Sequence, residues 1–240
     1  MFGLGTIINS GAIVIGGLLG ILFGRFFKEQ MQDSLTKTCG ICVLFIGMAG
    51  TFEHMIHIDN GLLVSGKSLL IIACLAIGTL IGELLGIENL FERFGQWLRD
   101  KTGNAKDKHF VDAFVYASLT VCIGAMAIVG AIEDGISGDI SILVTKAILD
   151  LIIIMVMTAA MGKGCLFSAI PVAIFQGLVT LLARLVRPLM IPEALSNVSM
   201  IGSILIFCVG INLIWKKKIR VANMLPAVIL AIAISFIPFI

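Results

Sequence analysis

Lys146 and Asp150 lie one helical turn apart inside a long apolar stretch, Ser141 to Pro188, which is interrupted at Gly162-Lys163-Gly164. Asp150 falls near the middle of the first apolar run of this stretch. A carboxylate at membrane depth is costly unless it is paired, wetted or protonated, so such groups usually mark a substrate or ion pathway. We therefore take this pair as the centre of a candidate site. The alternative is an ion pair with a purely structural role.

The second apolar run of the stretch carries Pro171 and Gln176 near its middle. A proline inside a helix removes a backbone donor and leaves a carbonyl free, here near Phe167, and a cation could bind that oxygen. We predict that Asp150, Gln176 and the backbone around Pro171 lie together near the membrane mid-plane and line a wet cavity. A packing kink at Pro171 is the alternative.

Uncharged amides in other apolar segments, at Asn9, Asn212 and Asn223, could add donors and acceptors to the same pathway. Hydrogen bonds that only hold helices together are the alternative role for each of them.

The composition is that of a membrane protein. Of 240 residues, 59% are hydrophobic and only 13% are charged, and the mean hydropathy is +1.10. Soluble domains carry about 25% charged residues. The six cysteines lie in or beside apolar stretches, where cysteine acts as a small hydrophobic residue and does not predict a disulfide framework.

Hydropathy predicts an all-α, polytopic bundle of about eight spans that forms a single integral membrane domain, residues 1–240. The expected spans are Gly5 to Gly24, Lys37 to Thr51, Ser68 to Ile87, Phe110 to Ile132, the two runs of the central stretch, Val198 to Trp215, and Val221 to Ile240. An acidic outer loop is expected at Glu133 to Asp139.

The basic residues favour one orientation. With the N-terminus outside, the cytoplasmic connections hold thirteen of the seventeen lysines and arginines, and the outer connections hold three. The thirteen are Arg25, Lys28, Lys37, Arg93, Arg99, Lys101, Lys106, Lys108, Lys163, Lys216, Lys217, Lys218 and Arg220. Since short cytoplasmic loops are enriched in such residues, we expect both termini outside, in a bacterial-type cytoplasmic membrane.

Glycines recur at every fourth residue in two spans, at Gly16, Gly20 and Gly24 and at Gly78, Gly82 and Gly86. Such ladders permit close helix packing. The two ladders could pack on each other or join two copies of the chain, which makes a homodimer a prediction.

The segment from Glu88 to Lys108 has apolar and aromatic residues at roughly helical spacing and reads as an amphipathic helix at the membrane surface. The polar linker Thr102-Gly103-Asn104 within this segment predicts two halves, 1–105 and 106–240. Spans 1–3 and 6–8 would have opposite orientations, as in inverted-repeat transporters.

The sequence contains no recognisable nucleotide-binding, metalloprotease or nucleophile motif, so no enzyme activity, cofactor or nucleic-acid partner is predicted. His54 and His57 with Glu53 and Asp59 do not form a recognisable zinc pattern, and no metal site is predicted.

Four ordered motifs, GTIINSGAIVIGGLLG, CIGAMAIVGAIEDGISGD, SAIPVAIFQG and KKIRVANMLPA, resemble the YqgA/YdfK-like bacterial inner-membrane family, domain-of-unknown-function family 554. The resemblance implies an uncharacterised membrane protein and suggests a sodium channel or pump, without assigning a role to any residue. From this resemblance and from the polar residues in the apolar spans, we expect the protein to transport or conduct a small solute in a process linked to a cation. The alternative is a non-transporting scaffold or sensor that acts through segment 88–108.

Overall fold

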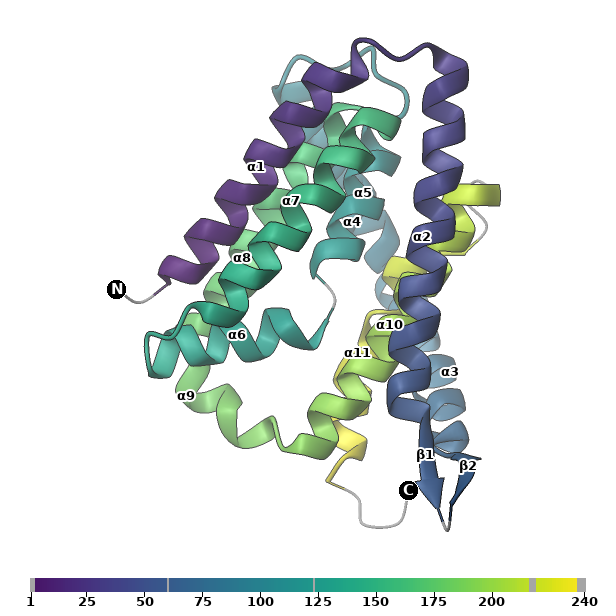
Figure 1. The fold of residues 1–240 in the computed structure, drawn as a ribbon, viewed down its shortest axis with the longest axis vertical. Helices are drawn as coiled ribbons and strands as arrows, with labels where there is room; N and C mark the ends of the chain where they lie inside the picture. The colour runs from purple at the N-terminus through teal and green to yellow at the C-terminus, as the bar shows by residue number, and fades with distance from the viewer. Residues whose placement is uncertain (1–2, 60, 123, 216–218, 237–240) are drawn as a thin grey trace. The chain divides into compact units, whose positions relative to one another are not determined.

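Helices account for almost all of the computed structural model, which describes residues 3–59, 61–122, 124–215 and 219–236 (Figure 1). The α-helices are α1 (Leu4–Gly24), α2 (Glu29–Met55), α3 (Ser68–Leu85), α4 (Ile87–Lys101), α5 (Phe110–Cys122), α6 (Ala125–Ile136), α7 (Ser141–Met161), α8 (Ala169–Leu181), α9 (Ala183–Val186), α10 (Pro192–Trp215) and α11 (Pro226–Ile234). Short 3₁₀ helices lie at Lys163–Ser168, Arg187–Leu189 and Val221–Met224. A two-stranded antiparallel hairpin, β1 (Ile56–Asp59) with β2 (Leu62–Ser65), pairs Ile56 with Ser65.

Six helical segments in the described residues are long and apolar enough to cross a membrane, and the bent pair α5 and α6 would make a seventh. The six include five single helices and the segment Lys163–Leu181. The expected last span is a shorter apolar helix, Val221–Ile234, and residues 237–240 lie outside the described part. The all-helical membrane architecture is therefore confirmed, whereas the count of eight spans is not.

Three local features differ from the sequence-based expectation. Helix α2 begins at Glu29 instead of Lys37, since its first two turns are polar and hydropathy does not detect them. The expected span at Phe110 to Ile132 is broken after Cys122, and the two pieces meet at 62°. The expected acidic loop is partly helical, because α6 continues to Ile136 and includes Glu133 and Asp134.

The chain forms two compact units, each built from early and late parts of the sequence. The first unit contains Met1–Cys39 and Leu90–Arg187, and the second contains Gly40–Asn89 and Pro188–Ile240. Both units draw on both of the predicted halves, 1–105 and 106–240, and those halves stay a prediction, as does the inverted repeat.

In the first unit, the glycine ladder of α1 packs directly on α7 (Figure 1). A Cβ atom added at Gly16 would meet the carbonyl oxygen of Leu151, and one added at Gly20 would lie 2.6 Å from Cβ of Thr158. The order of these contacts along both helices makes α1 and α7 parallel. The predicted close-packing role of this ladder is thus met within one chain.

In the second unit, the ladder of α3 packs on the last segment of the chain. A Cβ atom at Gly78 would meet the backbone of Ala227, and one at Gly82 would meet the carbonyl of Asn223. The two ladders therefore do not pack on each other. They are occupied within the chain, so the homodimer remains a prediction that has lost its original argument.

The N-terminus of α1 is capped by a carboxylate distant in sequence. The backbone amides of Gly3 and Gly5 donate to Asp134 at 3.2 and 2.9 Å, and Asp134 is fully buried. A carboxylate at a helix N-terminus satisfies free amides and complements the helix dipole. Asp134 therefore has a structural role, which corrects its expected place in an exposed acidic loop.

The start of α7 is held by Asp139, whose carboxylate accepts hydrogen bonds from the Ser141 hydroxyl at 2.6 Å and the Ser141 amide at 2.9 Å. The hydroxyl bond, followed by the amide bond, lowers the pKa of Asp139 below its ordinary value of 3.8.

Replacing Asp139 with alanine should lower the thermal unfolding midpoint near neutral pH. Because the folded pKa is depressed, this contribution is complete above the unfolded pKa and is lost as pH falls through the folded one. The thermal unfolding midpoints of the wild type and of Asp139→Ala should therefore converge as the pH is lowered. A difference between the two midpoints that stays constant with pH would contradict this role of Asp139.

Candidate functional site

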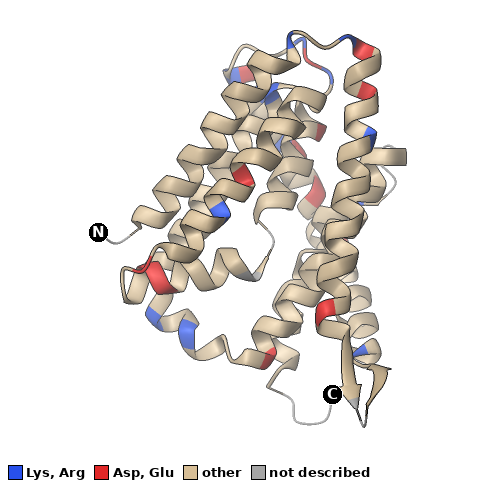
Figure 2. Ribbon diagram, in the orientation of Figure 1, with Lys and Arg blue, Asp and Glu red and all other residues tan. Residues whose placement is uncertain are grey.

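An ion pair lies inside α7, as its spacing predicts. The Lys146 ammonium donates to Oδ2 of Asp150 at 2.6 Å, and the two residues are only 7% and 3% exposed. They are the only charged residues of α7 (Figure 2), whose other residues are apolar except for Ser141, Thr145 and Thr158. The lysine therefore turns toward the carboxylate and does not extend to a membrane surface.

A second oxygen binds the same ammonium group. Nζ of Lys146 donates to the carbonyl of Val121 at 2.8 Å. Val121 lies in the last turn of α5, next to the break, and carbonyls in the last turn of a helix lack an intrahelical partner. The broken helix thus supplies an oxygen that sequence reasoning missed. The sequence feature at this break is Gly124. Its φ of 149° in the structure is an angle that strongly favours glycine.

Two amides pair across α1 and α8. The Asn9 side-chain nitrogen donates to Oε1 of Gln176 at 3.2 Å, and the residues are 0% and 1% exposed. Asn9 Oδ1 and Gln176 Nε2 have no hydrogen-bond partner among the described residues. A buried polar group without a partner costs about 1–3 kcal/mol.

Asn9 connects the amide pair with the ion pair, because its side chain also interacts with the Asp150 carboxylate. We call Asn9, Lys146, Asp150, Gln176 and the Val121 carbonyl the buried polar cluster. Four helices, α1, α5, α7 and α8, contribute to it, and all of it lies in the first unit. Its chemistry is that of a site for a positive charge, since two oxygen atoms already bind an ammonium group there.

Pro171 lies in the first turn of α8, directly after the 3₁₀ helix Lys163–Ser168, and both helices belong to one apolar segment, Lys163–Leu181. Its predicted place in a cation pathway stays a prediction. The carbonyl of Phe167 accepts from the amide of Ala169 and is not left free. The predicted break at Gly162 is confirmed, with a φ of 99°.

Asn212 and Asn223 belong to the second unit and hold backbone there. The Asn212 amide makes two hydrogen bonds with the backbone of Ile219, at 2.7 and 2.9 Å. Asn223 Oδ1 accepts from the Glu88 amide at 2.7 Å, and the Glu88 carboxylate accepts from the Ala222 amide at 2.9 Å. These contacts are typical of structural residues and do not link either asparagine to the buried polar cluster.

The predicted amphipathic segment forms α4, and part of its aromatic face is used within the first unit. Phe94 stacks on Trp97 and packs against Phe114 of α5, with both pairs of ring centroids 5.8 Å apart. The amphipathic segment is thus anchored to the bundle, although the side chains of Leu90 and Trp97 stay exposed.

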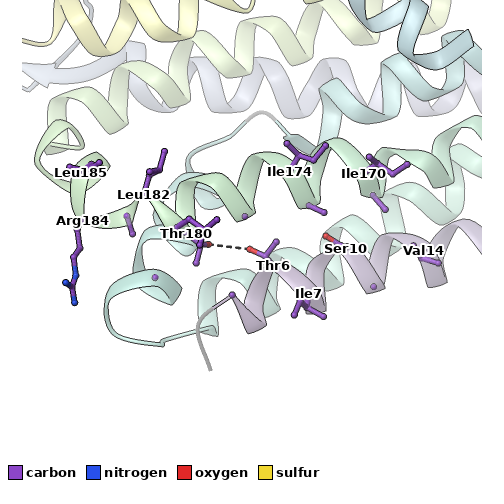
Figure 3. Close-up of a pocket in the computed structure, with 18 residues that line it drawn as sticks. Thr6, Ile7, Ser10, Val14, Ile170, Ile174, Thr180, Leu182, Arg184 and Leu185 are labelled. Atoms are coloured by element: carbon purple, nitrogen blue, oxygen red, sulfur yellow. Dashed lines mark hydrogen bonds between the residues drawn. The ribbon is translucent and has the colours of Figure 1, made fainter. Parts of the chain in front are cut away.

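A cavity of about 1100 Å³ lies along α1 and α8, bounded at one end by α9 (Figure 3). Neither Asp150 nor Gln176 lines it. Its walls include Ser10 and Gly11 from α1 and Ala173 and Gly177 from α8. It is therefore separate from the buried polar cluster, although the same two helices form both.

The chain belongs to the family described as protein of unknown function (DUF554), whose model matches residues 4–236. It is 26% identical over 233 residues to the uncharacterized membrane protein YdfK of Bacillus subtilis (strain 168), covering 97% of this chain and 96% of that one. It is 29% identical over 238 residues to the uncharacterized protein YqgA of Escherichia coli (strain K12), with coverages of 97% and 96%. No solved structure matches the chain. The fold and these relatives identify a multi-pass membrane protein.

Proposed function

We propose that the protein transports or conducts a small solute, with a cation as the substrate or the coupling ion. One observation carries the proposal. An ammonium group is bound by a carboxylate and a helix-end carbonyl inside an apolar span, beside two amide atoms that have no hydrogen-bond partner in the described part of the chain. Charged groups in membrane spans are costly and usually mark a pathway.

The atoms of the buried polar cluster are suited to a hard cation. Carboxylate, amide and backbone carbonyl oxygens are the ligands that such ions prefer. Asp150, Asn9 and Val121 supply one oxygen of each kind. Broken helices that present carbonyls at mid-membrane recur in transporters, and the break between α5 and α6 fits that pattern.

The test is flux in proteoliposomes. Purified protein should carry sodium, potassium or protons down an imposed gradient faster than protein-free liposomes of the same lipid composition. Small organic solutes should be screened with and without each cation gradient. If none of these gradients drives flux above the protein-free control, the transport proposal fails and a scaffold role gains support.

We further propose that both termini lie outside, as the distribution of basic residues favours. In a cysteine-free background, a cysteine at Ser137 should react with a membrane-impermeant maleimide on intact cells. A cysteine at Lys106, in the connection between α4 and α5, should react only after the membrane is opened. Lys106 lies between α4 and α5, and Ser137 lies between α6 and α7. The reverse labelling pattern would invert the proposed topology.

A further inference from the structure

The cavity along α1 and α8 is an open groove between two helices, and we call it the groove below. A Cβ atom added at Gly11 or Gly177 would meet no atom of the chain within 4 Å. Gly16 and Gly20, five and nine residues further along α1, instead pack closely against α7. The chain therefore leaves this hollow open while it packs the glycine ladder of the same helix tightly.

The depth of the groove matches one leaflet. On α1 its lining runs from Gly3, beside the first turn, to Val14. At 1.5 Å per residue this is about 16 Å. Half of a hydrocarbon core of about 30 Å is about 15 Å. A groove of this length that begins at one membrane surface would end near the mid-plane.

The polar atoms of the groove lie toward the end formed by the first turns of α1. At the shallow end, the hydroxyls of Thr6 and Thr180 lie 3.5 Å apart (Figure 3). One turn deeper, the buried Ser10 hydroxyl has no partner among the described residues. Ile7, Val14 and Ile174 form the apolar rim. The arrangement is amphipathic, with its polar end at the membrane surface.

An exposed arginine lies at that polar end. Arg184 lines the groove where α9 begins, is exposed, and forms no ion pair within the described part of the chain (Figure 3). Asp134, the buried carboxylate at this end of α1, is already bound to the amides of Gly3 and Gly5. The guanidinium group of Arg184 is therefore free to bind an external anion, and arginine is well suited to phosphate.

We propose that this groove binds one anionic phospholipid. Its phosphate pairs with Arg184, and one acyl chain lies over Gly11 and Gly177. A helix from a second copy of the chain would cross the full membrane, whereas the groove ends at half that depth. The bound lipid would cover a hollow that the chain itself does not fill. This proposal does not depend on the proposed transport function.

Native mass spectrometry in mild detergent tests the proposal with two lipids of identical acyl chains, phosphatidylglycerol and phosphatidylethanolamine. The wild-type chain should retain one phosphatidylglycerol in preference to phosphatidylethanolamine. Arg184→Gln should reduce this preference by about fivefold, which corresponds to the roughly 1 kcal/mol that an arginine contributes at an anionic membrane surface. Arg93→Gln, an equal charge change at an exposed site on α4, should leave it unchanged.

Gly177→Leu tests the acyl chain separately, because leucine would fill space that is open in the folded chain. It should remove the retained lipid while the thermal unfolding midpoint in detergent stays close to that of the wild type. The proposal is overturned if both lipids bind equally to the wild type, or if Gly177→Leu leaves lipid retention intact. It is also overturned if Gly177→Leu converts a dimer to a monomer without changing lipid retention, since the groove is then an interface between copies.

Discussion

Replacing Lys146 with methionine is expected to lower the free energy of unfolding by about 3–5 kcal/mol, because Asp150 would remain as a buried, unpaired carboxylate. The pair is 2.6 Å apart and almost wholly buried, so little water can compensate for the lost ammonium group. The measurement is unfolding in mixed micelles by a graded denaturing detergent. Lys163→Met, at an exposed lysine of the same unit, is the matched control and should change stability little.

The double variant Lys146→Met, Asp150→Leu tests whether the loss of stability comes from the unpaired carboxylate. Replacing a buried ion pair by apolar side chains of similar size is often neutral or stabilising. We therefore expect the double variant to recover most of the lost stability. If Lys146→Met costs no more than Lys163→Met, then Asp150 does not depend on the lysine, and the account of the buried polar cluster is wrong.

The second large effect is expected at Gly16. Leucine at this position would collide with the backbone of Leu151 and force α1 away from α7. Overpacking of this kind typically costs 1–3 kcal/mol, and we expect about 3 kcal/mol because the obstacle is backbone. Gly11→Leu makes the same change five residues earlier in α1, where the space is open, and should cost little. The same unfolding assay checks both. Equal losses would show that the α1 and α7 contact is not tight.

Long apolar helices could be predicted from the sequence because hydropathy is a strong signal over twenty residues. The expected first span, Gly5 to Gly24, differs from α1 by one residue, and the break at Gly162 follows from two glycines. The polar start of α2 could not be predicted in this way, since Glu29 to Thr36 has the composition of a loop. The break in the fourth span was missed because Gly124 stands in an apolar run like many packing glycines.

The candidate site was predictable in part. Lys146 and Asp150 follow from spacing on one helix, and their pairing depends on local geometry alone. The proximity of Asn9 to Gln176 depends on how α1 packs on α8, which no pattern in a single sequence indicates. Asn212 and Asn223 were predicted to line the pathway because the sequence does not show which groups lie next to their amides. An amide in an apolar stretch looks alike whether it binds a solute or, as here, the backbone beside it.

We propose that the buried polar cluster binds a cation, and the cation flux of the Asp150→Asn variant is the decisive measurement. Asparagine has nearly the same shape but no charge. Wild-type protein and the variant would be reconstituted at equal density, and flux would be followed with the cation that the wild type carries. We expect the variant to insert and to unfold cooperatively, with lower stability because Lys146 loses its carboxylate partner, and to lose cation-driven flux. Flux equal to that of the wild type in a fully folded variant would contradict it.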